Sequence, residues 1–273
     1  MLGLGSAAQL KEDAVRHALV ELDYRLVDTA SMDAPWYKNE DKIGEIIRSN
    51  DLKRTVFITT KMHAFNQGYD YAWRSFQASK ANLGPIDLYL LHYTHCMNPD
   101  GCDGTWKDSW RALEDLYMKN EVKAIGLSNV FPAHVQEIVA EARVIPHVIQ
   151  NRFDLFNQDR QVVHLCRKHH IFYQGYSTLG GQYWNREVNP VLTNPVVQEI
   201  ANELEVHPSQ VVLKWAVQQH IGVLPRSQNF DRLKLNSQVW SFYLSETHLK
   251  KLNELDGEGH EFSFEVSVNR LNW

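Results

Sequence analysis

Short apolar runs alternate with longer amphipathic segments along the whole chain. The runs are rich in Val, Ile, Leu and aromatic residues. In the segments between them, apolar residues recur at steps of three and four, as on one face of a helix. Each run leads into such a segment, which is the order expected of a parallel α/β fold. The expected strands are residues 2–5, 25–30, 55–61, 86–92, 122–129, 144–150, 171–177 and 221–227, and the expected helices include residues 8–22, 105–120, 132–142 and 158–170.

Eight strands of continuous apolar character favour a closed (β/α)8 TIM barrel, because its strands are buried on both faces. A doubly wound open sheet is the alternative. Its phosphate-binding fingerprint G-x-G-x-x-G would follow an early strand, but residues 3–6 ("GLGS") contain only a fragment of it. No Pro/Gly/Ser-rich linker divides the chain. We therefore predict an α/β barrel that forms a single domain over residues 1–273.

The composition narrows the class of protein further. A chain of 273 residues with 44% hydrophobic residues can bury a core without disulfides or a structural metal. The formal charge of -5 and the lack of a basic block exclude nucleic acid as an expected partner. No apolar run approaches the roughly 20 residues of a membrane span, and no signal peptide is evident, so we expect a cytoplasmic protein. The three cysteines, Cys96, Cys102 and Cys166, suit a reducing compartment better than a disulfide framework.

Polar residues stand at or just past the end of each apolar run from the second to the eighth. In a TIM barrel the chemistry lies at the C-terminal ends of the strands. One polar residue there means little, because strand ends meet solvent, but seven in phase indicate a single site. A buried lysine needs a carboxylate partner, and Asp28 is available to Lys61. The strand-end residues are Asp28, Lys61, His92, Ser128 with Asn129, Gln150, Tyr176, and Arg226 with Ser227.

A second cluster could be mistaken for a metal site. His92, His95, Cys96 and Cys102 are zinc-type ligands close together in sequence. Their spacing is not that of a standard pair of hairpin ligands, and His92 already belongs to the strand-end set. We predict no metal site.

Several motifs, in order, resemble the aldo-keto reductase superfamily, whose members are barrels that use NADPH to reduce carbonyls. The first four are "DYRLVDTA" followed by "YKNE", then "FITTK", "IDLYLLH" and "KAIGLSN". Further on, "VIQNRFDLFNQ", "YQGYSTLG" and "VLPRSQNFDRLKLN" resemble the family's cofactor-binding segments. The resemblance implies an NADP-dependent oxidoreductase that converts a small aldehyde or ketone to an alcohol, acting as a monomer or weak dimer.

The resemblance also implies catalytic roles. Tyr37 would donate the proton to the carbonyl oxygen, with Lys61 lowering the pKa of the phenol and Asp28 holding Lys61 charged. A two-unit decrease in this pKa requires about 2.7 kcal/mol of differential interaction. His92 would orient the carbonyl and donate to its oxygen as negative charge develops there.

Cofactor contacts are implied in the same way. The nicotinamide would lie on Tyr176, with its carboxamide held by residues of the fifth and sixth strands, while two guanidiniums would bind the 2′-phosphate. Without the motif, a solvated helix start is the simpler interpretation of those two arginines. The implied cofactor residues are Ser128, Asn129, Gln150, Tyr176, Ser177, Leu179, Arg226, Ser227, Arg232 and Asn236.

Departures from the family pattern affect cofactor and substrate. Arg226 stands where a lysine is usual and Leu235 where an acid or amide contacts adenine, so the preference for NADPH is open. Ala7 replaces a frequent tryptophan, although Trp36 and Trp106 could supply an aromatic wall. The chain begins at the first expected strand, so the N-terminal hairpin that usually plugs the barrel floor is expected to be absent.

The last departure is a four-residue insertion between Asp28 and Tyr37, which are separated by eight residues instead of four. Loop closure becomes only slowly less favourable with length, so Tyr37 can still reach the mouth if both flanks are anchored. We expect a turn at residues 33–35 and an outward bulge that places Met32, Pro35 or Trp36 at the substrate entrance. If the loop instead moves Tyr37 away from Lys61, the alternative is a cofactor-binding barrel with little turnover, acting as a regulatory or interaction subunit as potassium-channel β subunits do.

Overall fold

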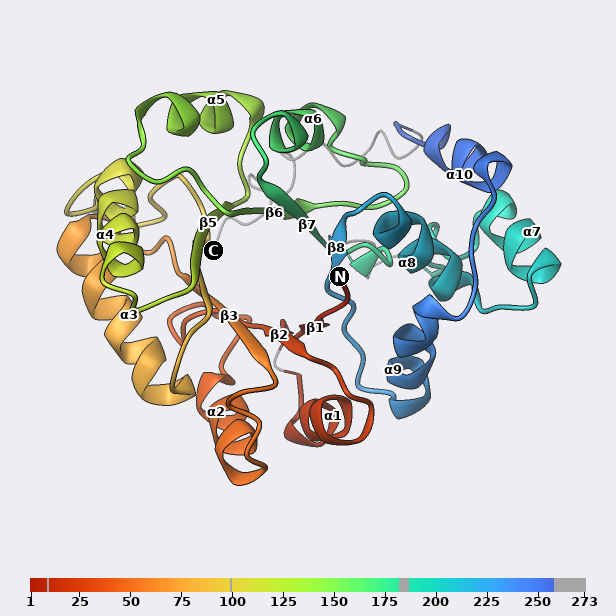
Figure 1. Ribbon diagram of the computed structural model, residues 1–273, viewed down its shortest axis with the longest axis horizontal. Coiled ribbons are helices and arrows are strands. Elements are labelled where there is room, and N and C mark those ends of the chain that lie inside the picture. The colour runs from red at the N-terminus through yellow and green to blue at the C-terminus, as the bar shows by residue number, and fades with distance from the viewer. Residues whose placement is uncertain (9, 99, 182–186, 258–273) are drawn as a thin grey trace.

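The computed structural model describes residues 1–8, 10–98, 100–181 and 187–257. These residues form an eight-stranded sheet in which each strand pairs in parallel with the next in chain order. Figure 1 shows the strands arranged around the centre of the molecule and the helices outside them. The strands are β1 (Leu4–Gly5), β2 (Leu26–Asp28), β3 (Phe57–Met62), β4 (Leu88–Leu91), β5 (Ala124–Ser128), β6 (Val148–Arg152), β7 (Phe172–Tyr176) and β8 (Gly222–Val223).

The sheet closes where β8 meets β1. Leu2 forms a parallel bridge with Val223, and the Gly3 amide donates to the Val223 carbonyl at 2.9 Å. One step further, the Gly5 amide donates to the Pro225 carbonyl at 3.1 Å. Closure removes both sheet edges, so the predicted barrel is confirmed and the open doubly wound sheet is excluded.

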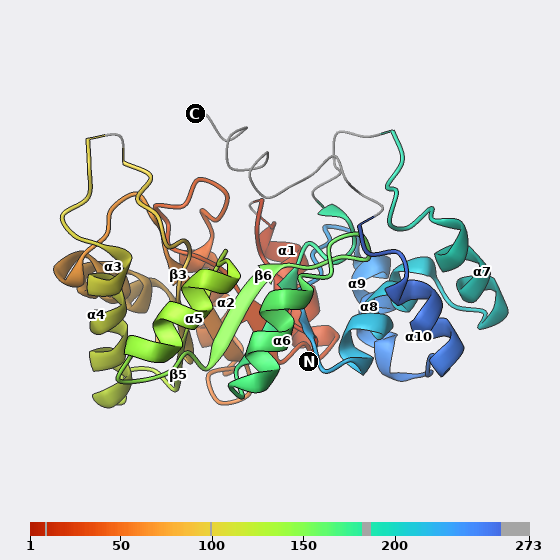
Figure 2. The ribbon, with the colours of Figure 1, turned by 90° about the horizontal axis from the view of Figure 1, so that it is seen from above.

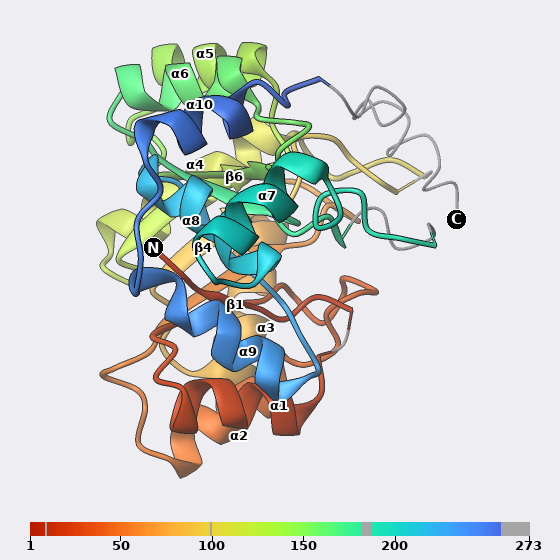
Figure 3. The same cartoon turned by 90° about the vertical axis from the view of Figure 1, so that its right-hand side faces the viewer.

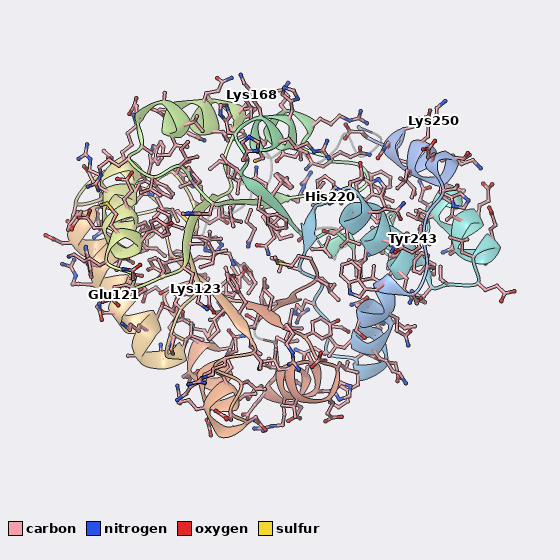
Figure 4. The ribbon with its side chains drawn as sticks, viewed as in Figure 1. Glu121, Lys123, Lys168, His220, Tyr243 and Lys250 are labelled. Atoms are coloured by element: carbon pink, nitrogen blue, oxygen red, sulfur yellow. A yellow bond between two sulfur atoms is a disulfide. The ribbon has the colours of Figure 1, made fainter. Side chains whose placement is uncertain are left out.

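Helices follow the strands and cover the outside of the barrel (Figure 1). Among the described residues they are α1 (Glu12–Arg16), α2 (Glu40–Ser49), α3 (Tyr69–Leu83), α4 (Trp106–Met118), α5 (Pro132–Glu141), α6 (Arg160–Lys168), α7 (Pro195–Glu203), α8 (Pro208–Gln218), α9 (Phe230–Ser237) and α10 (Glu246–Asn253), with a π-helix, η1 (His17–Glu21), and a 3-10 helix, η3 (Gln238–Trp240). Charged side chains such as Lys168 on α6 and Lys250 on α10 lie at the periphery (Figure 4).

Apolar side chains are buried on both faces of the strands, as the continuous apolar runs predict. Leu88, Leu90 and Val148 form a small cluster of their own. A much larger cluster contains residues of both strands and helices, including Phe153 and Trp215, whose rings stack with centroids 4.9 Å apart. Burial on both faces leaves the strand ends as the place where polar side chains can meet.

Element boundaries differ from the sequence-based expectation where proline intervenes. The strand expected at residues 144–150 begins only at Val148, because Pro146 has no amide hydrogen for the ladder. The run expected at residues 221–227 pairs as a strand only over Gly222–Val223, two residues before Pro225. The helix expected at residues 8–22 begins at Glu12 and continues as the π-helix η1, with Gln9 outside the described residues.

Long loops gather at one end of the barrel, at the top of Figure 2 and the right of Figure 3. They include the β2–α2 loop (residues 29–39), which carries the insertion, and the β4–α4 loop (residues 92–105).

Cys96 and Cys102 in the β4–α4 loop form a disulfide, so the expectation of reduced cysteines is wrong for this pair. The loop brings their Cα atoms to 6.1 Å, a separation that a disulfide can span. No helix within the described ranges has the length and apolar character needed to cross a membrane.

A close approach between β5 and its neighbours leads to a test of this packing. A Cβ atom on Gly126 would lie 2.1 Å from the Val148 carbonyl oxygen and 2.7 Å from a methyl group of Leu90. We expect Gly126→Ala to lower the free energy of unfolding by about 1–3 kcal/mol through overpacking. Urea denaturation would measure the loss. Gly181→Ala, whose Cβ would approach Ser177 no closer than 3.6 Å, is the control, and equal stability of the two variants would contradict the prediction.

Candidate active site

A buried ion pair lies where β2 and β3 end. Asp28 lies opposite Thr59 in the register, and Lys61 points to the same face as Thr59 because side chains alternate along a strand. The Lys61 ammonium is fully buried and donates to Asp28 Oδ1 at 2.5 Å and to the Thr29 carbonyl at 2.8 Å. The partnership of Asp28 and Lys61 expected from the sequence is therefore present.

The second oxygen of Asp28 accepts a hydrogen bond from an amide. Gln150 Nε2 donates to Asp28 Oδ2 at 2.7 Å and to Gln174 Oε1 at 2.8 Å. Gln150 was expected to hold the nicotinamide carboxamide, whereas here its amino group belongs to the ion-pair network. Sequence reasoning missed Gln174, although a polar residue inside an apolar run, two positions before Tyr176 and so on the same strand face, was a usable signal.

Tyr37 and His92 lie beside this pair. The Lys61 ammonium is 5.1 Å from the centre of the Tyr37 ring. The Tyr37 and His92 rings meet edge to face with centroids 5.7 Å apart. The four residues with expected catalytic roles are thus gathered in one place, and the insertion does not remove Tyr37 from the neighbourhood of Lys61.

Residues just after Tyr37 anchor the loop. Asn39 accepts a hydrogen bond from Thr29 Oγ1 at 3.0 Å, and Glu40 accepts one from Thr60 Oγ1 at 2.7 Å. Asn39 and Glu40 are both buried, so these bonds tie the start of α2 to the ends of β2 and β3. Tyr37 is therefore attached to a rigid element two residues downstream.

The insertion itself is compact. The Ala34 amide donates to the Ser31 carbonyl at 2.8 Å and the Tyr37 amide donates to the Ala34 carbonyl at 3.1 Å, which makes two successive turns. Pro35 is exposed and Trp36 is 47% exposed, while Ala34 is buried. The expected turn and outward bulge are both present.

Burial governs the protonation of Tyr37. Desolvation raises the pKa of its phenol well above the ordinary value, and the negative charge of Asp28 raises it further. The expectation that Lys61 lowers this pKa is therefore wrong for the structure. Asp28, at 2.5 Å, neutralises most of the field of the ammonium before it reaches the phenol. Tyr37 holds its proton across the physiological pH range.

His92 is neutral in the same environment. Burial, followed by the charge of Lys61 and then the interaction with the His63 imidazole, holds the pKa of its imidazole well below the usual range. Among the described residues, His92 Nδ1 is buried without a hydrogen-bond partner. The side chain can therefore act as a neutral hydrogen-bonding group near Tyr37.

The residues expected to hold the nicotinamide lie on the adjoining strands. Asn129 has a left-handed backbone (φ 56°), and its Nδ2 donates to the His92 carbonyl at 2.9 Å. Its Oδ1 accepts from the Tyr176 hydroxyl at 2.6 Å, and Ser128 Oγ donates to the Gln150 carbonyl at 2.7 Å. These groups form one network between β5, β6 and β7. The other two expected residues, Ser177 and Leu179, are half-buried in the turn that follows β7.

The residues expected to bind the 2′-phosphate lie before and at the start of α9. Arg226 is exposed, and its Nη2 donates to the Ala8 carbonyl at 3.1 Å. Ser227 Oγ accepts from the Asn229 amide at 3.0 Å. Arg232 is exposed in the first turn of α9, and its backbone amide is capped by the Asn229 side chain at 2.9 Å. Asn236, further along α9, is buried.

Sequence reasoning also missed two rings beside His92. The Tyr93 ring stacks on it at 4.9 Å, and the His63 ring meets it edge to face at 6.2 Å. Tyr93 directly follows His92, and His63 comes two residues after Lys61, so closeness in sequence to a strand-end residue was the available signal. The zinc-type ligands are not gathered here, because Cys96 and Cys102 are bonded to each other. Among the described residues, no three His, Cys, Asp or Glu side chains are grouped so that they could hold a metal ion.

Comparisons with known proteins identify the family. The family model described as "Aldo/keto reductase family" matches residues 3–257. The chain belongs to the aldo/keto reductase family. It is 35% identical over 247 residues to the 9,11-endoperoxide prostaglandin H2 reductase of Trypanosoma cruzi, a match that covers 89% of this chain and 82% of the relative. The glyoxal reductase of Bacillus subtilis is 31% identical over 243 residues, with 88% and 81% covered.

A solved structure is similar to this chain over nearly its whole length. A variant of Gox0644 in complex with NADPH superimposes with a TM-score of 0.82 at 30% identity, covering 96% of this chain and 91% of the other. This aldo/keto reductase is therefore an oxidoreductase that acts on carbonyl compounds.

The buried ion pair makes a pH-dependent prediction. Asp28→Asn leaves the Lys61 ammonium unpaired, which we expect to lower the free energy of unfolding by about 3–5 kcal/mol at pH 7. Burial already lowers the pKa of Lys61, and removal of Asp28, which raises it, lowers it further. Unfolding of the variant then takes up a proton, so its stability rises with pH up to the unfolded pKa of about 10.4.

Urea denaturation at pH 7 and pH 9.5 would measure the change. The deficit of Asp28→Asn relative to the unmodified protein should shrink at pH 9.5. The double variant Asp28→Asn with Lys61→Met is the control. It has no ammonium at this position to titrate, so its own stability should lack the rise with pH expected of Asp28→Asn. A deficit of Asp28→Asn that grows at pH 9.5 would contradict the assignment.

Proposed function

We propose that the protein reduces an aldehyde or ketone to the alcohol with NADPH as the hydride donor. The observation that carries this proposal is the arrangement of Tyr37 and His92 beside the buried pair of Lys61 and Asp28. A phenol that keeps its proton and a neutral imidazole side by side are the two groups that a developing alkoxide needs. The reductase activity in the names of the two relatives and the NADPH bound to Gox0644 support the same reaction.

The residues present fit an NADPH molecule at the strand ends. Arg226 and Arg232 are exposed, and no ion pair within the described residues uses either guanidinium, so both are available to a phosphate. Ser128, Asn129 and the side-chain oxygen of Gln150, whose amino group is already bound, would meet the carboxamide. Tyr176 would meet the nicotinamide face. When bound, the nicotinamide supplies the hydride. Ser177 and Leu179, in the turn that follows β7, would lie beside the nicotinamide, and Ser227 and Asn236 would contact the adenosine end.

Tyr37 would deliver the proton to the carbonyl oxygen. Its raised pKa keeps the proton in place before reaction, and the phenol then gives the proton to the strongly basic alkoxide oxygen that develops at the carbonyl. The Lys61 ammonium lies 5.1 Å from the centre of the Tyr37 ring. Lys61 cannot turn away, because Asp28 and the Thr29 carbonyl hold it. Neutral His92 would orient the same oxygen. Trp36 and Trp106 are candidates for the wall of the substrate entrance.

Removal of the Tyr37 hydroxyl tests the proton donor. We expect Tyr37→Phe to lower kcat for NADPH-dependent aldehyde reduction by about 10²–10⁴-fold, the usual contribution of a positioned acid. The dissociation constant for NADPH should stay within about twofold, measured by quenching of tryptophan fluorescence. Tyr243→Phe, at a tyrosine that is 77% exposed and lies outside the ring of strands, is the matched control and should keep full activity (Figure 4).

The pH dependence of the unmodified enzyme tests the same assignment. Because the pKa of Tyr37 is raised well above 10, its proton is not lost between pH 7 and pH 9. The kcat for reduction should therefore be flat over that range when measured at saturating NADPH and aldehyde. A fall in kcat centred below pH 9 and absent from Tyr37→Phe would contradict it. Protein that binds NADPH yet reduces no member of a broad carbonyl panel would refute the proposed function itself.

A charge removal tests the phosphate assignment. Arg226→Ala should weaken NADPH binding by about 10–100-fold, which corresponds to a charge-assisted hydrogen bond of roughly 1.5–3 kcal/mol. NADH, which lacks the 2′-phosphate, should lose less than about threefold. Arg167→Ala, on the outer face of α6, is the control for a change of one surface charge. Equal losses for NADPH and NADH would show that Arg226 does not meet the phosphate.

A further inference from the structure

His63 is a second imidazole at the mouth of the barrel. It follows β3 directly and is half-buried. Its ring lies 6.2 Å from the ring of His92, with an angle of 79° between their planes. His92 in turn lies 5.7 Å from Tyr37. The proposed reaction uses Tyr37 and His92 but leaves His63 without a role.

The hydrogen bonds of His63 determine which nitrogen carries its proton. The backbone amide of Phe65 donates to His63 Nδ1 at 3.1 Å, so Nδ1 is the acceptor. Burial lowers the pKa of the ring, opposed by the negative charge of Asp33 and assisted by the positive charge of Lys38, which face it from the β2–α2 loop. A neutral imidazole whose Nδ1 accepts must carry its hydrogen on Nε2. His63 therefore presents an N–H donor on the side of the ring away from Phe65.

Two imidazoles at this spacing can hold two oxygens of one small molecule. If His92 and Tyr37 meet the carbonyl that is reduced, the neighbouring donor is placed for an oxygen on the next carbon. A substrate without that oxygen leaves the donor to water or unpaired. Discrimination by hydrogen bonding is stronger than discrimination by shape alone for molecules of nearly equal size.

We propose that His63 is a specificity-determining residue whose Nε2–H binds a second oxygen on the carbon next to the reacting carbonyl. The substrate class is that of 2-oxoaldehydes, 1,2-diketones and 2-hydroxyaldehydes. This inference rests on the proposed carbonyl reduction and concerns the preference within it.

Two substitutions separate the donor from the cap on the Phe65 amide. In His63→Asn, the side-chain oxygen can still accept from the amide two residues on, as in an Asx turn, but nothing reaches the position of Nε2. In His63→Gln, the longer amide can place an N–H group near that position, while the short-range cap is lost. One variant therefore keeps the cap and the other keeps the donor.

The experiment compares kcat/KM for methylglyoxal and propanal, which have the same three-carbon chain and differ at the second carbon. Hydration of either aldehyde cancels when the same substrate is compared between variants. We expect His63→Asn to lower the methylglyoxal-to-propanal ratio by about five- to tenfold, the effect of one neutral hydrogen bond. His63→Gln should keep the ratio within about twofold. His164→Asn, exposed on α6, is the control and should leave both values unchanged.

The outcomes are distinguishable. An unchanged ratio in His63→Asn, or equal losses for both aldehydes, would overturn the role of His63 while propanal turnover by the unmodified protein upholds the proposed function. A lower methylglyoxal-to-propanal ratio in His63→Gln but not in His63→Asn would show that the preference depends on the hydrogen bond from the Phe65 amide. That result would also overturn the proposed role of His63. If the unmodified protein turns over neither aldehyde with NADPH, the proposed function fails, and this inference fails with it.

Discussion

The arrangement of the site depends on one requirement, that the charge of a fully buried lysine be matched. Lys61 has no access to water, so Asp28 and the Thr29 carbonyl must satisfy it. Asp28 in turn needs a donor for its second oxygen, which Gln150 provides while bonding Gln174. A chain of four hydrogen-bonded, buried side chains thus crosses the barrel interior from Lys61 on β3 to Gln174 on β7. Each of them restricts the rotamer of the next.

The same requirement explains why the pKa of Tyr37 is raised. An ammonium that is already paired at 2.5 Å projects little field, so it cannot offset the desolvation of the phenol. Lys61 therefore holds Asp28 and the end of β2 in place and does not make the phenol more acidic. The loop that carries Tyr37 tolerates its extra residues because Asn39 and Glu40 are anchored to β2 and β3. Loop length matters less than the attachment of its two ends.

Much of this could be predicted from the sequence, because burial leaves a visible pattern. Continuous apolar runs predicted the eight strands, and the need of a buried lysine for a carboxylate predicted the partnership of Lys61 and Asp28. Features that depend on distances between side chains could not be predicted. Whether Gln150 meets Asp28 or a ligand, which way the pKa of Tyr37 moves, and whether Cys96 meets Cys102 are decided by separations of a few ångströms that the order of residues does not encode. Proline was decisive at Pro146, where its missing donor outweighs the apolar neighbours.

The seam between β8 and β1 has a consequence for the dynamics of the barrel. Few backbone hydrogen bonds close it, at Gly3, Val223 and Gly5, and just beyond them the Arg226 side chain bonds the Ala8 carbonyl. A joint with so few bonds is the natural place for the barrel to open locally without unfolding. Amide hydrogen exchange at Gly3 and Gly5 would therefore report the opening of the seam. A ligand that binds the Arg226 guanidinium while its bond to the Ala8 carbonyl stays intact would slow that exchange.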